Sequence, residues 1–598
     1  MKKIKIIAIV ALIAPAFSLL TSCSDLFEPA IENEKQTDML YDLPSWATGL
    51  LGHAYISNPV GSWSFNDVAT DDAVSNDPYD NYRRMATGSW RSNNNPMDRW
   101  QYLRASWQYL NQFITMTDDI HWANDPIVSE LFRQRMKGDA LGMRAFYMYH
   151  LLMNHAGYTA DGQLLGIPIL TEPEEVVTEG DIAGTYNHAR NTFVECLAQL
   201  NKDIEDAITL LPEDYGDALP MPSKYASTGA TEAQYHRVFG DNGKNRMSAR
   251  IARAVRAQAA LLAASPAYSD GSGVTWEQAA NRMAEVLNGL GSNPIAELDA
   301  TGNKWYADGA AIQNMTAGSN VKEMLWRGNK EQNASLEQTH YPPTLFGSGR
   351  LNPTQNLVDA FPAKNGYPIT DANSGYNANT PYDNRDPRLD LYIIRNGSTA
   401  GPNNAVITTA VSGSDENALG KTATSTRTGY YMKKHLVQSV NANPQMTTSQ
   451  YHYKAFMRYT EFFLGYAEAA NEAWGPTGTG SNSYSAYDVI KAIRARAGIG
   501  ADNGDAYLES IKNDQTKMRE LIRNERRLEL CFEGFRFWDL RRWKAPLNEA
   551  AKGMSISGST YTVLPTVEAR SYQDYMYYGP IPYSEVLKFS NLVQNAGW

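Results

Sequence analysis

Apolar residues recur at helical spacing along much of the chain. Three long amphipathic segments come first, at residues 100–115, 130–153 and about 189–211, and Pro212 ends the last of them. Apolar residues three and four positions apart place one face of a helix against a core, so each segment is predicted to be an α-helix. The pattern is typical of a mainly α-helical protein.

Two later pairs of helical segments are rich in small residues. The first pair is 248–265 with 276–290, and the second is 459–473 with 487–498, where Gly498 is the expected C-cap. Small residues at helical spacing let two antiparallel helices pack closely, as they do in tetratricopeptide hairpins. We therefore expect helical hairpins to form the scaffold.

Two stretches between these helices lack helical periodicity. Residues 302–390 alternate loops with short strand-like runs, and residues 75–96 are dominated by Asn, Asp, Ser and Pro. Long loops in compact proteins are usually functional or disordered. The second stretch also holds Tyr79, Tyr82, Arg83 and Trp90. Two interpretations stay open: these side chains contact a ligand, or they pack the loop onto the body of the protein.

The stretch 523–543, RNERRLELCFEGFRFWDLRRW, combines apolar residues at near-helical spacing with many charged residues. It is predicted to be one helix that buries aromatic rings while arginine–carboxylate pairs tie neighbouring loops together. Gly534 in its middle indicates a close backbone approach. A catalytic role for the carboxylates is the weaker interpretation, because each has an arginine within one helical turn. The expected pairs are Arg526 with Glu529, Glu533 with Arg536, Arg536 with Asp539, and Asp539 with Arg542.

Residues 1–22 have the organisation of a bacterial signal peptide. Lys2, Lys3 and Lys5 precede an apolar run at residues 6–20, which is shorter than the roughly 20 apolar residues that span a bilayer. The run leads into Leu-Thr-Ser-Cys at residues 20–23, which resembles a lipobox. We therefore predict cleavage before Cys23 and lipidation of its thiol, which would anchor the mature chain to a membrane.

Composition narrows the class of partner. The 598 residues are 43% hydrophobic and 20% charged, with a formal net charge of −11, so a globular protein is expected and a nucleic-acid partner is disfavoured. The 35 Tyr and 13 Trp residues suit a surface that stacks on flat apolar faces, although large cores use these rings too. Three cysteines do not form a disulfide framework, and Cys196 and Cys531 fall within helical patterns as small buried residues.

Motifs of common catalytic and metal sites are missing from the sequence. HExxH, CxxC and G-x-S-x-G do not occur, and no EF-hand spacing is present, so no cofactor is predicted and metal binding is left open. The carboxylate pairs Asp71/Asp72 and Asp383/Asp386 are the strongest enzymatic candidates. A structural role is favoured for both pairs, with Asp386 capping a turn or pairing with Arg388.

Several of these segments together resemble one family. The stretch 523–543 resembles the C-terminal signature of the SusD/RagB family, outer-membrane lipoproteins that capture nutrients for a TonB-dependent transporter. Further family elements resemble, in the same order, LVDAFPAKNGYPITD at 357–371, DNRDPRLD at 383–390, TRTGYYMKKHL at 426–436 and the closing segment 577–598. With the lipobox and the helical pattern, the resemblance covers nearly the whole chain.

The resemblance implies a SusD-like fold, with tetratricopeptide-like helical hairpins as scaffold, loop-rich segments and a few short strands. It divides the chain into a signal peptide (1–22), an N-terminal helical region (23–300) and a C-terminal SusD/RagB region (301–598) that form one compact unit after cleavage. It further implies a cell-surface, lipid-anchored, non-enzymatic protein that binds oligo- or polysaccharide and delivers it to a SusC-like transporter. A RagB-like peptide receptor and a surface glycoside hydrolase are the alternatives.

The family also indicates where a ligand would bind. Its contacts come from the loop ahead of the first scaffold helix and from the loops that precede the DPR segment. Trp100 begins a helix and equally suits a core position, and Trp326 lies in an apolar run that favours the core. The ligand-binding residues predicted on this basis are Arg83, Trp90, Asn94, Trp100, Trp305, Tyr341 and Phe346.

Overall fold

The computed structural model describes residues 40–175, 180, 182–316 and 318–598. The predicted signal peptide and Cys23 lie outside this range. Among the residues described, no helix has the length and hydropathy needed to cross a membrane. The long helices are α2 (Pro44–Ile56), α4 (Trp100–Met116), α5 (Pro126–His155), α7 (Phe193–Leu210), α10 (Ala249–Ala264), α12 (Trp276–Asn288), α17 (Tyr459–Trp474), α18 (Ala486–Arg496) and α20 (Gln515–Glu529).

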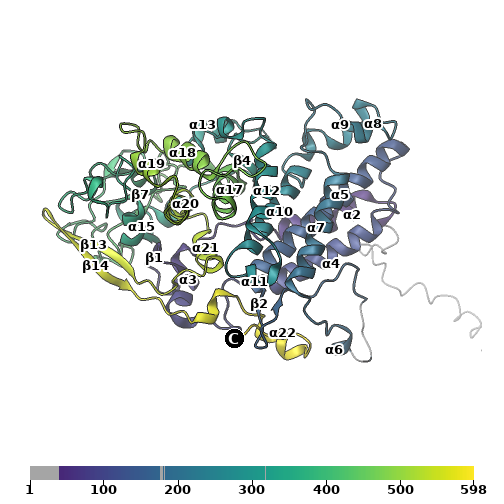
Figure 1. Cartoon of the computed structure of the whole chain (residues 1–598), viewed down its shortest axis with the longest axis horizontal. Helices are drawn as coiled ribbons and strands as arrows, with labels where there is room; N and C mark the ends of the chain where they lie inside the picture. The colour runs from purple at the N-terminus through teal and green to yellow at the C-terminus, as the bar shows by residue number, and fades with distance from the viewer. Residues whose placement is uncertain (1–39, 176–179, 181, 317) are drawn as a thin grey trace, which may run out of the picture.

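These helices pack in a continuous row that forms one half of the molecule (Figure 1). Neighbours in the row are α2 with α4, α4 with α5, α5 with α7, α7 with α10, α10 with α12, and α12 with α17. At its far end α17 packs on α18 and α20. The mainly helical scaffold predicted from the sequence is therefore confirmed.

Local signals fix where the helices begin and how closely they approach. The Asp125 carboxylate accepts from the backbone N–H of Ile127 at 2.9 Å, which caps α5. A Cβ added at Gly465 on α17 would lie 2.9 Å from the Met283 side chain on α12, so a larger residue there would push the helices apart. Gly498 follows α18 with φ 81°, as the C-cap prediction required.

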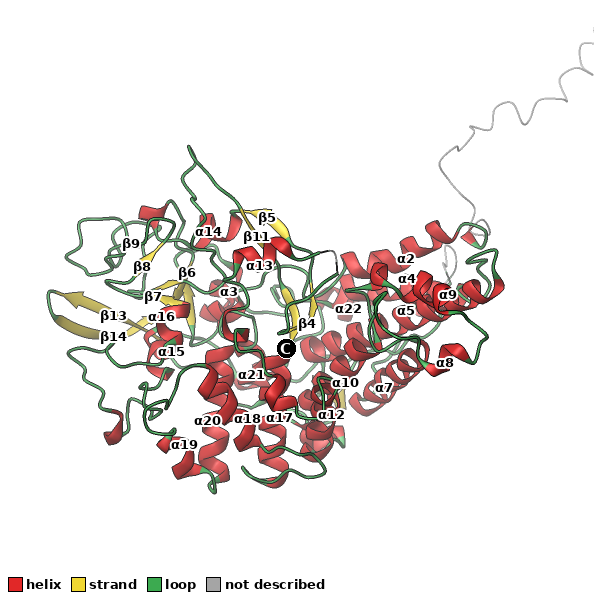
Figure 2. Ribbon diagram, turned by 90° about the horizontal axis from the view of Figure 1, so that it is seen from above, coloured by secondary structure: helices red, strands yellow, loops and turns green. Residues whose placement is uncertain are grey.

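The second half is built from loops, short helices and paired strands (Figure 2). Its short helices include α14 (Ser335–His340), α15 (Gln355–Ala360), α16 (Arg388–Tyr392) and α19 (Ala506–Ile511). In the described chain each sheet is one antiparallel pair: β1 (Ala73–Ser75) with β6 (Leu351–Pro353), β4 (Met324–Arg327) with β12 (Ala455–Arg458), β5 (Glu331–Asn333) with β11 (Gln450–His452), β7 (Ile393–Ile394) with β10 (Tyr431–Met432), β2 (Gly157–Tyr158) with β3 (Leu164–Leu165), β8 (Thr399–Ala400) with β9 (Ala405–Val406), and β13 (Ala551–Ser557) with β14 (Thr560–Glu568).

The C-terminal stretch 523–543 is two helices and not the single helix predicted. Helix α20 ends at Glu529, a turn follows, and α21 (Arg536–Arg542) begins a new direction. Phe532 and Gly534 lie in the turn with φ 61° and 85°, and left-handed backbone ends a helix. The nearest atom to a Cβ placed on Gly534 is 3.6 Å away, so its role is conformational freedom, and the expected close backbone approach is wrong.

The predicted arginine–carboxylate network exists, but most of its partners come from distant parts of the chain. Of the expected pairs, Asp539 with Arg542 is confirmed at 2.9 Å. Arg526 pairs instead with Asp539 at 2.8 Å, across the turn. Arg536 reaches Asp71 at 2.9 Å. The network therefore ties α20 and α21 to the N-terminal loops.

Candidate functional site

A cleft of about 830 Å³ lies where the helical half meets the loop-rich half. Its walls come from the end of α2, the loop 57–65 that follows it, α4, the turn between β4 and β5, and α14. Pairing of β1 with β6 brings the segment after Ser75 beside Arg350 and Leu351. Segments far apart in the sequence thus meet at one site. We call this site the cleft.

Aromatic side chains line the cleft. Tyr102 on α4 is 46% exposed. In the loop 57–65, the rings of Trp63 and Phe65 are nearly parallel, with centroids 6.2 Å apart and an interplanar angle of 5°. Phe65 also meets the buried His340 edge-on at 4.5 Å. Partly exposed rings of this kind offer flat apolar faces to a ligand.

Amide, carboxylate and guanidinium groups complete the cleft. The Arg350 guanidinium donates to the Asn76 side-chain oxygen at 3.2 Å and lies 3.8 Å from the Asp77 carboxylate. The Asp80 carboxylate accepts from the backbone of Tyr82 at 2.9 Å, and burial raises its pKa. Such groups can hydrogen-bond the hydroxyls of a polar ligand. The polar side chains lining the cleft include Asn58, Asp77, Asp80, Asn329, Glu331, Asn333 and Arg350.

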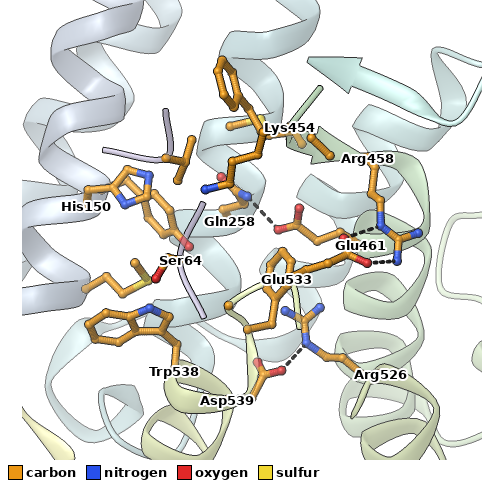
Figure 3. A pocket seen from close by; sticks show the side chains of 18 of the residues that line it. Ser64, His150, Gln258, Lys454, Arg458, Glu461, Arg526, Glu533, Trp538 and Asp539 are labelled. Atoms are coloured by element: carbon orange, nitrogen blue, oxygen red, sulfur yellow. Dashed lines mark hydrogen bonds and ion pairs between the residues drawn. The ribbon is translucent and has the colours of Figure 1, made fainter. Parts of the chain in front are cut away.

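A second, smaller cavity of about 130 Å³ lies beside the cleft, and we call it the inner pocket (Figure 3). It is enclosed by α5, α10, α17, the α20–α21 turn and the loop 57–65. Gln258 donates to Glu461 at 2.7 Å across it, as Figure 3 shows. Trp63, Lys454 and Phe456 line both cavities and form the boundary between them.

The structure places most of the predicted ligand-binding rings in the interior, and their role in ligand binding stays a prediction. Trp90, Trp100 and Tyr341 are 1%, 2% and 0% exposed, so their faces are covered by protein. Trp90 packs against Trp598 with centroids 4.9 Å apart. Trp305 is also buried, at 5% exposure, but it lines the inner pocket. Trp326 is buried, as expected.

The other three predicted residues are accessible but stand outside the lining of the cleft. Arg83 pairs with Glu568 at 2.8 Å. The Asn94 side-chain amide donates to the Ser89 carbonyl at 3.0 Å. Phe346 is 53% exposed, with φ 63° at the end of a short turn. None of the three is brought together with the rings of the cleft.

The cleft draws on both loop regions named from the sequence, yet through different residues. Trp63 and Phe65 stand in SNPVGSWSF, where Asn58, Pro59 and Gly61 are strong turn formers. Aromatic residues within such a turn-rich segment indicate an accessible loop that could contact a ligand, and the sequence interpretation did not use this indication. Tyr102 carried a second signal, since it lies on the polar side of the amphipathic α4.

The carboxylate pairs have structural partners. Asp71 and Asp72 both contact Arg527, and the Asp71 contact is 2.8 Å. Asp386 pairs with Arg388 at 2.7 Å, which confirms the predicted pairing. Within the part of the chain that the structure describes, no group of three or more His, Cys, Asp or Glu side chains could hold a metal ion.

Solved structures with the same architecture define the fold. A SusD-like protein from Bacteroides fragilis matches with a TM-score of 0.68 and 20% identity, over 94% of this chain and 99% of that one. A SusD-like carbohydrate-binding protein from the same species matches at 0.65 and 21%, over 92% and 99%. A laminarin-binding SusD-like protein matches at 0.55 and 16%, over 93% and 99%. The fold is SusD-like.

Sequence comparison agrees with the fold. The model of the SusD family matches residues 311–598, and a model described as starch-binding and associating with the outer membrane matches residues 63–233. SusD-like protein P2 of Formosa agariphila is 30% identical over 139 residues, 23% of this chain and 24% of that protein. SusD-like protein P38 of the same organism is 34% identical over 86 residues, 14% and 16%. These matches span about a quarter and a sixth of the two relatives. The chain belongs to the SusD family.

Proposed function

We propose that this chain captures oligo- or polysaccharide in the cleft and delivers it to a SusC-like TonB-dependent transporter. In this proposal Cys23 carries the lipid that holds the protein at the outer membrane, facing the cell surface. The protein acts by binding and release and carries out no catalysis. Motion relative to the transporter moves the ligand inward when the bound and released states differ in ligand affinity.

The observation that carries this proposal is the composition of the cleft. Tyr102, Trp63 and Phe65 present ring faces, while Asn329, Arg350 and their neighbours present hydrogen-bonding groups. A sugar ring has apolar C–H faces and a rim of hydroxyls, so it needs both kinds of contact at once. Membership of the SusD family, and the carbohydrate-binding relatives of the same fold, support the same conclusion.

Substitution of Tyr102 tests the site. Tyr102→Ala removes a half-exposed ring from the cleft wall, and we expect glycan affinity to fall about tenfold, or about 1.4 kcal/mol. Tyr109→Ala is the matched control, because Tyr109 lies two turns further along α4 with 42% exposure and does not line the cleft. Calorimetric titration of both variants with the same glycan measures the difference. Equal glycan affinities in the two variants would show that the glycan does not bind at Tyr102 in the cleft.

A further inference from the structure

Lys454 differs from the other lysine and arginine side chains that line the cleft and the inner pocket. Each of the others forms an ion pair with a carboxylate; these are Arg350, Arg458, Arg526 and Arg542. Within the described part of the chain, Lys454 is paired with no carboxylate. The chain holds 65 acidic residues against 54 lysines and arginines, so acids are not scarce. A partly buried cation without a counter-charge is costly, which indicates that a ligand supplies the charge.

The ammonium group of Lys454 is held at the boundary between the two cavities. The Gly328 N–H donates to the backbone carbonyl of Lys454 at 2.9 Å and so fixes this residue beside the end of β4. The Lys454 side chain lines both the cleft and the inner pocket, where Figure 3 shows it. Its ammonium donates to the Ser62 carbonyl in an exposed contact. An ammonium has three donors, so two of them stay available to a ligand.

A second cation without a carboxylate partner lies near Lys454. Arg99 precedes α4, and within the described residues its guanidinium donates only to the Asp98 carbonyl, at 3.3 Å. Burial lowers the pKa of Lys454 to about 7, and the charge of Arg99 acts in the same direction. Burial raises the pKa of Tyr102 and Arg99 opposes that rise, so the guanidinium also lies near this ring of the cleft. We call Arg99 and Lys454 the cation pair.

The carboxylates around the two cavities do not neutralise the cation pair. In the inner pocket, Glu533 pairs with Arg458 at 2.8 Å, and Asp539 pairs with Arg526 at 2.8 Å. In the cleft, Asp77, Asp80 and Glu331 are the acidic side chains of the wall. None of these carboxylates is among the groups that shift the pKa of Lys454. An anionic group beside Lys454 would therefore meet two cations without a competing acid, and it would favour the protonated ammonium.

Aromatic side chains share the boundary with Lys454. Trp63 and Phe456 line both cavities, as Lys454 does, and Tyr102 lines the cleft. A uronic acid or a sulfated sugar has the C–H faces and hydroxyls of a neutral sugar and adds one anionic group. Its ring can pack on aromatic faces while the anionic oxygens accept charge-assisted hydrogen bonds from lysine and arginine.

We propose that the cation pair binds the anionic group of an acidic glycan whose sugar ring packs on the aromatic side chains beside it. The anionic group is a uronic acid carboxylate or a sulfate ester, which share the chemistry of a compact, negatively charged oxygen acceptor. This inference rests on the proposed function and narrows the captured ligand to glycans that carry negative charge.

Titration with acidic chains and their neutral counterparts tests the inference. The purified protein is titrated by calorimetry with oligosaccharides of galacturonic, glucuronic, mannuronic and guluronic acid and with the methyl esters of the same chains. Sulfated and unsulfated galactan oligosaccharides form the second arm. We expect at least one acidic chain to bind about tenfold more tightly than its neutral counterpart, and this preference to shrink as salt is added. The arm that shows the preference identifies carboxylate or sulfate as the anion.

Variants assign the preference to the cation pair. Lys454→Gln keeps a donor for the Ser62 carbonyl and removes the charge, and Arg99→Gln removes the second charge. Each should weaken binding of the acidic chain about tenfold and change binding of its neutral counterpart less than about twofold. Lys454→Arg keeps the charge and should retain the preference. Lys421→Gln is the matched control, because the Lys421 ammonium also donates to a backbone carbonyl, that of Gly413, and lines neither cavity.

The results separate this inference from the proposed function. Equal affinity for acidic and neutral chains would overturn the inference and leave glycan capture standing, with only solvent anions at the cation pair. A preference for acidic chains that survives both Lys454→Gln and Arg99→Gln also overturns it. Failure of every glycan to bind would contradict the proposed function itself. Melting temperatures confirm that the variants are folded, and Arg99→Gln decides the matter if Lys454→Gln does not fold.

Discussion

At the scale of single residues, Glu461 and Glu533 show how burial and pairing set opposite charge states. Both lie in the wall of the inner pocket (Figure 3). Burial raises the pKa of Glu461 to about 7, with Arg526 opposing it only in part. Burial acts on Glu533 as well, but Arg458 and Lys434 outweigh it and hold its pKa at about 2. The first carboxyl destabilises the folded state when ionised, and the second stabilises it.

The Glu461→Gln variant should make stability less dependent on pH. The folded protein retains a proton that the unfolded chain releases between about pH 4.5 and pH 7, so ionisation of Glu461 lowers the free energy of unfolding as pH rises through that window. The variant should match the native protein near pH 4.5 and exceed it by about 3 kcal/mol at pH 8. Denaturant unfolding at a series of pH values measures the difference.

Glu533→Gln is the contrasting control for that experiment. Its native carboxylate has a lowered pKa, so its contribution is present above about pH 4.5 and is lost as the pH falls toward 2. The variant should therefore be less stable than the native protein at neutral pH. If the stability difference between Glu461→Gln and the native protein stayed constant from pH 4.5 to pH 8, Glu461 would be ionised over that whole range in the folded protein, and the raised pKa would be wrong.

Site residues in loops were hard to predict from the sequence. The sequence does not show whether a tryptophan in a polar loop faces solvent or the interior. A loop has no periodic pattern of apolar residues from which the buried side could be identified. Trp90 packs inward against Trp598, and Trp63 is partly exposed. The pairing of Asp386 with Arg388 was predictable because the two residues are close in sequence.

At the scale of elements, α20 and α21 act as a clasp between the two halves. Arg527 on α20 and Arg536 on α21 both reach Asp71, which precedes β1. β1 in turn pairs with β6 at the cleft. These contacts fix the loop that leads into the cleft wall, so the position of the cleft depends on the clasp.

The Arg527→Met variant should destabilise the protein by about 3–5 kcal/mol. It leaves the buried Asp71 and Asp72 with Arg536 as their main counter-charge, and an uncompensated buried charge is expensive. Thermal or denaturant unfolding measures the loss. Lys202→Met is the control, because Lys202 pairs with Asp206 on the exposed face of α7 and should change stability by less than about 0.5 kcal/mol. Equal effects would contradict a structural role for the clasp.

The helices were predictable and the break in the clasp was not. Long amphipathic segments such as α4 and α5 can be recognised by the helical period of their apolar residues, and Asp125 additionally marks the start of α5. The α20–α21 turn keeps near-helical spacing of its apolar residues while Phe532 takes a left-handed conformation that its side chain disfavours. Gly534 was the one visible sign of a break.

At the scale of the whole molecule, the packed helical row supports a half that consists mostly of loops. The cleft lies at their junction, so helices α2 and α4 and the loops of the other half both contribute to its walls. The division at residue 300 stays a prediction, and α12 packs on α17 across it. Which glycan binds could not be predicted, because the loops 57–65 and 328–351 carry no repeating pattern.

Calorimetry on the chain beginning at Ser24, titrated with a glycan panel and with peptide mixtures, tests the central claim most directly. Chromatography of the same samples detects any cleavage products. Our account predicts saturable glycan binding with the ligand recovered intact. Saturable binding of peptides in place of glycans would make the protein a RagB-like peptide receptor, and cleavage of the glycan would make it an enzyme; either result would contradict the account.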